Sequence, residues 1–185
     1  MDVVGIRGPR IRLVPIDRDA HIDNFLRWFN DPEVTRWLAR DWPMTRLGEE
    51  KWVDRISVSE TDLTWAVLDE TGRHIGSTGV HRIDWRSRSA GTGTVIGEKD
   101  AWGKGYGTEI MRVRSTWAFE NAGLNRLASE CFAGNLASAR CLEKVGYRRI
   151  GIARQRYFRG GRWHDCILWD YLAEEYFAGR ELEGA

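Results

Sequence analysis

Trp102-Gly103-Lys104-Gly105-Tyr106-Gly107-Thr108 is the stretch that decides the fold, because it joins a predicted strand to a predicted long helix. Glycine lets the backbone approach a bulky phosphate closely, so glycines at alternate positions favour several N–H groups converging on one anion. The start of the following helix adds the positive end of its dipole, and Lys104 adds a full charge. The spacing therefore predicts a loop that binds a pyrophosphate.

Two better-known phosphate loops do not fit this spacing. A dinucleotide-binding fingerprint needs glycine at the position of Thr108. A mononucleotide-binding loop needs Ser or Thr directly after its Gly-Lys pair, where this chain has Gly105. The remaining alternative for the segment is a flexible turn capped by Thr108, with no ligand.

Apolar periodicity predicts a mixture of helices and strands along the rest of the chain. Gly160-Gly161 marks a tight hairpin near the end. The expected elements are a strand at 11–14, helices near 16–29, 34–38 and 49–58, strands at 64–68, 74–80 and 92–96, a long helix from the loop to Gly123, a strand at 124–132, a helix at 135–145, and strands at 147–159 and 162–171. This order predicts one α/β domain over residues 1–185, with helices on both faces of a mixed sheet and a loose end at about 180–185.

Composition indicates an ordinary soluble domain. The 185 residues are 42% hydrophobic and 30% charged, and no apolar run approaches the roughly 20 residues of a membrane span. The first residues lack the pattern of a secretory signal, so we expect a cytoplasmic protein. Cys131, Cys141 and Cys166 are far apart, which favours three reduced thiols over a disulfide framework or a zinc site, and we expect no metal.

Charge and aromatic content indicate where ligands bind. The formal net charge of +1 offers little attraction to nucleic acid. We call the following six arginines the arginine ribbon: Arg148, Arg149, Arg154, Arg156, Arg159 and Arg162. It is interpreted either as a solvated hairpin face or as a surface that meets an acidic ligand or partner. Trp28, Trp37 and Trp42 lie in one stretch with polar neighbours, where partly exposed rings would wall a cleft for a substrate.

The loop and a second block together resemble the GCN5-related N-acetyltransferases (GNAT). That family's pyrophosphate loop reads Gln/Arg-x-x-Gly-x-Gly/Ala. The form found here, with Trp102 first and Gly-Lys-Gly after it, is similar to the branch of the ribosomal-protein N-terminal acetyltransferases, the Rim-type enzymes. Residues 135–147 resemble that branch's Asn-x-x-Ser segment followed by Glu-Lys-x-Gly-Phe/Tyr. Residues 10–13 and 28–34 are also similar, so the resemblance covers nearly the whole chain.

The resemblance implies a mostly antiparallel sheet in which two central parallel strands, 92–96 and 124–132, splay apart around the pantetheine arm of acetyl-CoA. Backbone groups left unpaired by the splay would bind the amides of the pantetheine arm and polarise the thioester carbonyl. The implied acetyl-CoA-binding residues are Val95, Ile96, Gly97, Trp102, Gly103, Lys104, Gly105, Tyr106, Gly107, Thr108, Asn135, Ser138 and Lys144. A plain helix cap is the alternative role for Asn135, and compensation of a helix dipole is the alternative for Lys144.

The implied reaction is direct attack of a primary amine on the thioester. The acceptor is expected to be an α-amine of a protein or peptide, or a small-molecule amine, bound by Trp28, Trp37, Trp42 and His81. In much of the superfamily a tyrosine protonates the departing thiolate at the position of Leu142. The ribosomal branch uses the serine that corresponds to Ser138, so we predict Ser138 as the catalytic residue, with a first-turn helix serine as its alternative role.

The general base is not assigned. Relatives often place a glutamate where this chain has Gly91. The remaining candidates are His81, Asp84, Glu130 and His164. Because the usual acid and base positions are both occupied by other residues, a non-catalytic coenzyme A-binding sensor is the alternative function. Related proteins are often dimers, and the aromatic content allows a homodimer, with the oligomeric state left open. We expect neither nucleic acid nor a membrane as a partner.

Overall fold

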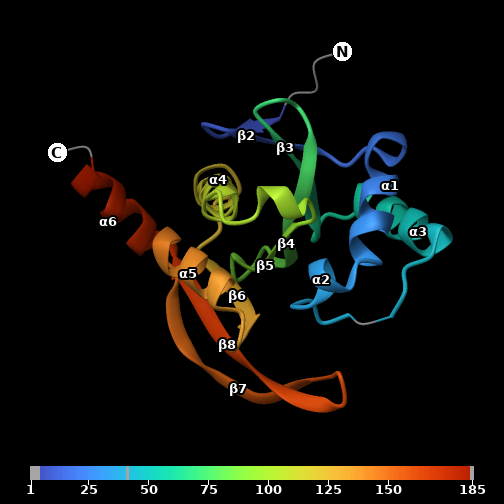
Figure 1. Ribbon diagram of the computed structural model, residues 1–185. Helices are drawn as coiled ribbons and strands as arrows, with labels where there is room; N and C mark the ends of the chain where they lie inside the picture. Colours follow the sequence, from blue (N-terminus) through green and yellow to red (C-terminus); the bar gives the residue numbers. More distant parts are fainter. Residues whose placement is uncertain (1–4, 41, 184–185) are drawn as a thin grey trace.

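An eight-stranded sheet runs through the computed structural model, which describes residues 5–40 and 42–183 (Figure 1). In spatial order the strands are β1 (Ile6–Arg7), β2 (Ile11–Pro15), β3 (Leu63–Asp69), β4 (His74–Asp84), β5 (Ser89–Ile96), β6 (Arg126–Phe132), β8 (Arg162–Leu172) and β7 (Arg148–Arg159). Neighbouring strands are antiparallel except β5 and β6, which are parallel. The predicted sheet is confirmed, with the short edge strand β1 as an addition.

β5 and β6 pair over only a short distance. Their parallel register joins residues 89–91 to residues 126–128. The hydroxyl of Thr92 donates a hydrogen bond to the carbonyl of Ala128 at 3.0 Å, at the point where the strands part. Beyond this point β5 pairs with β4 alone. The predicted strand 92–96 is therefore the diverging part of a longer strand, and the predicted splay is confirmed.

The helices are α1 (Arg18–Phe29), α2 (Pro32–Thr35), α3 (Arg46–Ser57), the 3₁₀ turn η1 (Lys99–Ala101), α4 (Tyr106–Glu120), α5 (Leu136–Val145) and α6 (Ala173–Glu183). Side chains of Asp17, Asp31, Thr45 and Asn135 accept N–H groups at the starts of α1, α2, α3 and α5. The sequence marks Thr45 as a helix start, and Thr45 does cap α3, so the apolar pattern from residue 49 covers only part of that helix. The Asp31 cap begins α2 at residue 32, where the sequence predicted residue 34.

The chain end also differs from expectation. Residues 180–183 belong to α6, where the sequence predicted a loose segment, while residues 184–185 lie outside the described part. Tyr176 explains the order of this helix, because its ring is 8% exposed and packs near those of Phe119 and Tyr171.

Neighbouring residues of β5 belong to two different cores. Val95 packs with Phe25 and Trp28 of α1, whereas Ile96 packs with Ile110 of α4. The first helices and α4 therefore cover opposite faces of the sheet at β4 and β5 (Figure 1). The diverging end of β5 lies between these two layers, which places any ligand of the splay at the centre of the molecule.

Glu49 of α3 is a buried carboxyl group for which we predict an effect on stability. It is 1% exposed, and neither of its oxygens has a hydrogen-bond partner among the described residues. Burial raises the pKa of Glu49 from 4.5 to about 7, and the nearby Arg40 only partly opposes this. The folded protein thus keeps a proton that the unfolded chain releases. The contribution of Glu49 to the free energy of unfolding is fully present below pH 4.5 and is lost as the pH rises towards 7.

Replacing this group should remove that pH dependence. Over this interval we expect the free energy of unfolding of the wild type to fall by up to about 3 kcal/mol through this group, and Glu49→Gln to lose that part of the decline. Urea unfolding between pH 5 and 8 measures this, with Glu50→Gln as the matched control on the adjacent residue. Parallel stability curves for the wild type and Glu49→Gln would contradict the prediction.

Candidate functional site

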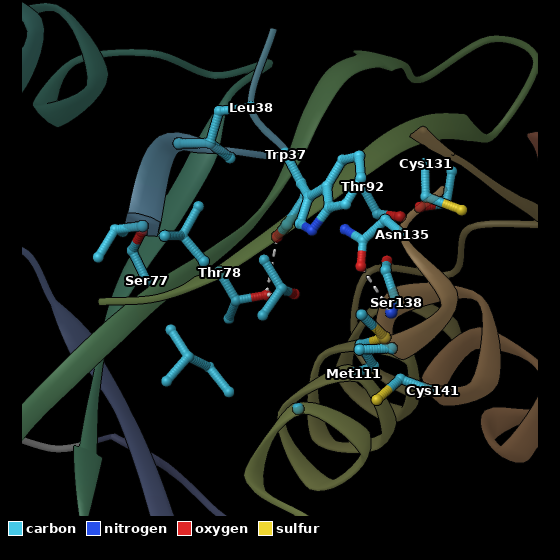
Figure 2. A pocket seen from close by; sticks show the side chains of 18 of the residues that line it. Trp37, Leu38, Ser77, Thr78, Thr92, Met111, Cys131, Asn135, Ser138 and Cys141 are labelled. Atoms are coloured by element: carbon cyan, nitrogen blue, oxygen red, sulfur yellow. Dashed lines mark hydrogen bonds between the residues drawn. The ribbon is translucent and has the colours of Figure 1, made fainter. Parts of the chain in front are cut away.

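A cavity of about 940 Å³ runs from the start of α4 into the gap between β5 and β6. The predicted residues that line it are Trp37, His81, Val95, Ile96, Trp102, Gly103, Gly105, Tyr106, Gly107, Thr108, Asn135, Ser138 and Lys144. Trp28, Trp42, Gly97 and Lys104 are not among its lining residues. Figure 2 shows Trp37, Thr92, Asn135 and Ser138 gathered in this pocket from different elements.

The start of α4 differs from the capped helices. Its N-cap is Gly105, with φ +87° and no capping side chain. The N–H groups of Tyr106, Gly107 and Thr108 in the first turn therefore have no intrahelical acceptor, and these residues line the cavity. Gly103 also has positive φ, at +73°. The loop thus presents free donors and the positive end of a helix dipole, which suits an anionic group.

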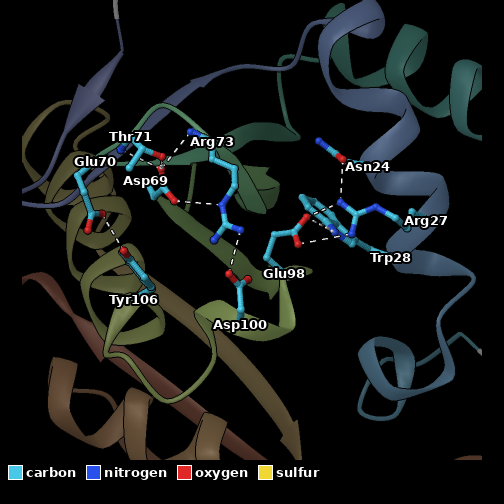
Figure 3. Close-up of polar contacts among 10 residues, drawn as sticks. All are labelled: Asn24, Arg27, Trp28, Asp69, Glu70, Thr71, Arg73, Glu98, Asp100 and Tyr106. Carbon is cyan, nitrogen blue, oxygen red and sulfur yellow. Dashed lines mark hydrogen bonds and ion pairs between the residues drawn. The ribbon is translucent and has the colours of Figure 1, made fainter.

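Side chains hold this loop in place (Figure 3). The hydroxyl of Tyr106 donates to Glu70 at 2.7 Å, and Arg73 donates to Asp100 at 2.9 Å. Tyr106 is itself 7% exposed and packs in the core beside Ile110, so its buried side chain anchors the loop. The donors at the start of α4 are therefore fixed before any ligand arrives.

Arg10 fixes the other side of the loop. Its backbone N–H and its Nε donate to the carboxylate of Glu109 at 2.6 and 2.9 Å, and its Nη1 donates to the carbonyl of Lys104 at 3.1 Å. The Lys104 backbone therefore serves the loop, and its exposed side chain lies outside the cavity lining.

The register of β5 corrects part of the predicted backbone site. The N–H of Gly97 donates to the carbonyl of Ile75 at 2.9 Å, so it is not left unpaired by the splay. Because an antiparallel ladder alternates, the peptide groups of Val95 also face β4, and those of Thr94 and Ile96 face the gap. The indole N–H of Trp102 donates to the Ile96 carbonyl at 2.8 Å. The backbone groups available to a ligand are therefore the N–H and carbonyl of Thr94 and the N–H of Ile96.

Trp28 and Trp42 do not wall the cleft. Trp28 is 1% exposed, and a Cβ on Gly97 would lie 1.9 Å from its ring. Its indole N–H donates to Glu98 at 3.1 Å (Figure 3). Trp28 therefore packs on the face of β5 that α1 covers, opposite the face that α4 covers. This packing requires glycine at position 97. Trp42 is 58% exposed and lies beside Arg40, away from the cavity.

Trp37 does lie in the cavity wall. Its ring packs against Gly134, where a Cβ would come within 2.9 Å. Arg159 of the arginine ribbon donates to the carbonyls of Thr35 and of Leu38, the latter at 2.5 Å. The segment that carries Trp37 is therefore held by the β7–β8 hairpin, which gives one arginine of the ribbon a structural role that neither interpretation of its sequence included.

Asn135 and Ser138 lie together at the second splayed strand. The Oδ1 of Asn135 accepts the backbone N–H of Ser138 at 3.2 Å, so the helix-cap role of Asn135 is confirmed (Figure 2). Ser138, in the first turn of α5, and Cys131 of β6 both line the cavity. Burial raises the pKa of the Cys131 thiol, and the neighbouring Trp169 and Ser138 side chains partly oppose the change. Leu142, one turn further along, is a 1% exposed core residue.

Aromatic side chains form another part of the cavity wall. Phe29, Trp52, Phe132 and Tyr157 line it, and the last two rings stack with centroids 5.2 Å apart. The hydroxyl of Tyr157 donates to Glu130 at 2.5 Å. Sequence reasoning missed Phe29, Trp52 and Tyr157 because they sit on three separate elements and share no local pattern.

The candidate bases separate into two pairs. His81 and Glu130 line the cavity. Burial lowers the pKa of His81, against the effect of Asp62, whose carboxylate lies 3.7 Å away. Asp84 instead accepts N–H groups of the following turn, and His164 contacts the carbonyl of Arg159 at 3.2 Å. Gly91 is the last residue of β5 that pairs with β6.

The other predictions concern cysteines, metals and membranes. All three cysteines are unpaired, with Cys131 and Cys166 buried and Cys141 half-buried. Within residues 5–40 and 42–183, no three His, Cys, Asp or Glu side chains gather in a way that could hold a metal ion. In the same part of the chain, each helix is too short or too polar to cross a membrane.

Comparison with known proteins agrees with this geometry. Residues 10–148 match the family described as Acetyltransferase (GNAT) domain. The chain is 30% identical to "Uncharacterized N-acetyltransferase YoaA" of Bacillus subtilis, over 84% of this chain and 89% of that protein. It is 33% identical to "Putative ribosomal N-acetyltransferase YdaF" of Bacillus subtilis, over 57% of each. The spermidine N-acetyltransferase of Vibrio cholerae, solved with CoA and spermine, superposes with a TM-score of 0.86 at 16% identity, over 92% of this chain and 99% of that one.

The fold and the family match define the class of protein. The chain belongs to the GNAT acetyltransferases, and it is an acyltransferase that uses acetyl-CoA as co-substrate. The resemblance inferred from the glycine loop and from the Asn135 block is thereby confirmed.

Proposed function

We propose that this chain transfers the acetyl group of acetyl-CoA to the α-amine of a peptide or protein. One observation carries the proposal, namely that the uncapped start of α4 and the gap between β5 and β6 belong to one cavity. The wall of the same cavity also includes the aromatic side chains Phe29, Trp52, Phe132 and Tyr157, which would bind the acceptor. A donor and an acceptor would thus share one cavity.

The donor fits the cavity by charge and by length. The N–H groups of residues 106–108 would bind the diphosphate, and Lys144 in the cavity wall would add a positive charge. From Ile96 back to Thr92 the strand spans about 13 Å at 3.3 Å per residue, a distance that extended pantetheine covers. The N–H and carbonyl of Thr94 and the N–H of Ile96 would bind its amides, which leaves the thioester near Thr92.

The chemistry then needs few side chains. The nitrogen lone pair of the neutral amine attacks the thioester carbon, the C–S bond breaks with its electron pair on sulfur, and the amine nitrogen loses a proton. Ser138, which lines the same cavity, would donate a hydrogen bond to the sulfur as it leaves. The thiolate of coenzyme A resembles that of cysteine, with a pKa of about 8.5, so it ends as a thiol once it takes up a proton.

The charges of the cavity wall favour a single amine as acceptor. Among the described lining residues the carboxylates are Glu33 and Glu130. Glu33 pairs with Lys99 at 2.5 Å, and Glu130 holds Tyr157 and lies 3.5 Å from Arg156. A polyamine needs several free carboxylates, which the cavity lacks among the described residues. The name of the YdaF relative, which gives a ribosomal acceptor, also favours a protein terminus.

The ionisation of the acceptor supports the same choice. Deprotonating a lysine-like ammonium of pKa about 10.4 at neutral pH costs about 4 to 5 kcal/mol, whereas an α-amine of pKa about 8 costs about 1. An α-amine therefore reacts without a strong general base, and the usual glutamate position is Gly91 here.

Isothermal titration calorimetry tests the donor site. We expect coenzyme A to bind saturably and pantetheine, which lacks the diphosphate, to bind about 100-fold more weakly, because the donors at the start of α4 then have no anion to bind. The pair of ligands is its own control, since both carry the arm that enters the splay. Absence of saturable heat with coenzyme A would overturn the proposed function.

Ser138→Ala tests the role of the serine. We expect kcat to fall about 100-fold while KM for acetyl-CoA changes little, because a donor aimed at a developing charge acts mainly in the transition state. Ser129→Ala, a second serine of the cavity wall, is the matched control and should stay within about twofold of the wild type. An unchanged kcat for Ser138→Ala under saturating substrates would remove Ser138 from the mechanism.

A panel of acceptors tests the substrate class. We expect release of free coenzyme A thiol with peptides that carry an unblocked α-amine and none with the same peptides after N-terminal acetylation. Spermidine should react at least tenfold more slowly in kcat/KM, because the described carboxylates of the cavity are already paired. A preference for spermidine would replace the peptide proposal with a polyamine one, and tight binding of acetyl-CoA with no reactive acceptor would favour the sensor.

A further inference from the structure

Arg114 is a positively charged side chain enclosed beside the cavity. It lies on α4, is 1% exposed and forms part of the cavity wall. Its Nη1 donates to the hydroxyl of Thr94 at 2.9 Å, the carbonyl of Gly93 at 3.0 Å and the hydroxyl of Thr78 at 3.2 Å. Its Nη2 donates to the hydroxyl of Tyr147 at 3.1 Å. The guanidinium is therefore fixed beneath β5 by contacts on two sides.

The charge of Arg114 has no counter-ion in the part of the chain that the structure describes. No carboxylate there lies within 4.0 Å of its nitrogens, and its buried Nε has no hydrogen-bond partner. Neutral oxygens satisfy the other donors without neutralising the charge. Burial of an unpaired charge is costly, and the folded chain does not itself offset that cost with a negative group.

The position of Arg114 relates it to the reaction. Its contacts with residues 93 and 94 place the guanidinium two to three residues beyond the last pair between β5 and β6. The proposed function puts the thioester near Thr92, the residue next to these contacts, so the present inference rests on that proposal. The positive charge of Arg114 also acts on His81 of β4. Burial is the main cause of the lowered pKa of His81, and repulsion from Arg114 lowers it further.

We infer that Arg114 stabilises the negative charge that forms on the sulfur of coenzyme A when the acetyl group is transferred. As the C–S bond breaks, its electron pair moves to sulfur while the amine nitrogen bonds to the carbonyl carbon. Arg114 attracts the resulting thiolate across the hydroxyl of Thr94 and does not move, because its four hydrogen bonds hold it. Arg114 thus acts on the sulfur electrostatically without touching it, whereas Ser138 would donate a hydrogen bond to the sulfur.

Other ionisable groups also face this part of the cavity. Those that line the cavity include His81 from β4, Glu130 and Cys131 from β6, and Arg140, Cys141 and Lys144 from α5, with Lys144 proposed for the diphosphate. Arg140 is exposed and therefore screened by water, whereas Arg114 is enclosed by protein. A unit positive charge about 8 Å from a thiol sulfur, at an effective dielectric constant of about 20, lowers the pKa of that thiol by about 1.5. The effect of Arg114 is thus large enough to measure.

The test is the ionisation of enzyme-bound coenzyme A, read from the ultraviolet absorbance of its thiolate against pH. The complex with S-methyl coenzyme A is subtracted, because it removes the signal of the three protein cysteines. We expect the wild type to lower the pKa of the bound thiol by about 1.5, Arg114→Lys to keep part of this, and Arg114→Met to abolish it. For Arg114→Met we also expect kcat about 30-fold lower, with KM for acetyl-CoA changed less than threefold.

Tyr147→Phe separates charge from structure. It removes one hydrogen bond of the guanidinium and keeps the positive charge, so the pKa of the bound thiol should stay as in the wild type. A wild-type complex with an unshifted thiol pKa overturns the inference, even if Arg114→Met does not fold. So does Tyr147→Phe abolishing the shift as completely as Arg114→Met. If coenzyme A does not bind at all, the proposed function fails as well, whereas binding with an unshifted thiol overturns this inference alone.

Discussion

The parting of β5 from β6 is the constraint on which the rest of the structure depends. The two parallel strands share hydrogen bonds only up to Gly91 and Ala128. Beyond them the peptide groups of Thr94 and Ile96 lack a strand partner, and unpaired backbone groups away from water cost free energy. A ligand with amides of its own relieves that cost, so the interrupted sheet is at once a weakness of the fold and its binding site.

The surrounding contacts keep the strands apart without a ligand. On one face Trp28 packs on Gly97 with no room for a Cβ, which holds the end of β5 against β4 and α1. At the other end Arg10 and Tyr106 tie the glycine loop to β2 and to the turn after β3. Rigid supports on both sides let the gap persist. A preorganised site of this kind loses less free energy to ordering when the ligand binds.

Features of the site could be predicted from the sequence where the interacting residues are close together along the chain. The glycine loop, the Asn135 cap and the diverging strand are local patterns, and all three were predicted. Trp28 and Gly97 were assigned to the ligand because the contact between them joins residues about seventy positions apart, and a single sequence does not show it. Arg114 gave no signal either, because its place in a helical stripe says nothing about the strand oxygens that receive its hydrogen bonds. The missed features are those that exist only once the sheet is assembled.

The distribution of charge along the cavity connects the donor and the acceptor. At the loop, free N–H groups would face the phosphates, and at the splay Arg114 would lie near the thioester. The cavity wall also carries aromatic rings and paired carboxylates. A positive charge that favours a thiolate at the splay also disfavours an ammonium at the same place. The same charge would lower the pKa of an acceptor amine that binds there, which favours the neutral form that attacks the thioester. One buried guanidinium would thus assist both the leaving group and the nucleophile, and a site of this kind would not need a carboxylate at position 91, which is glycine here.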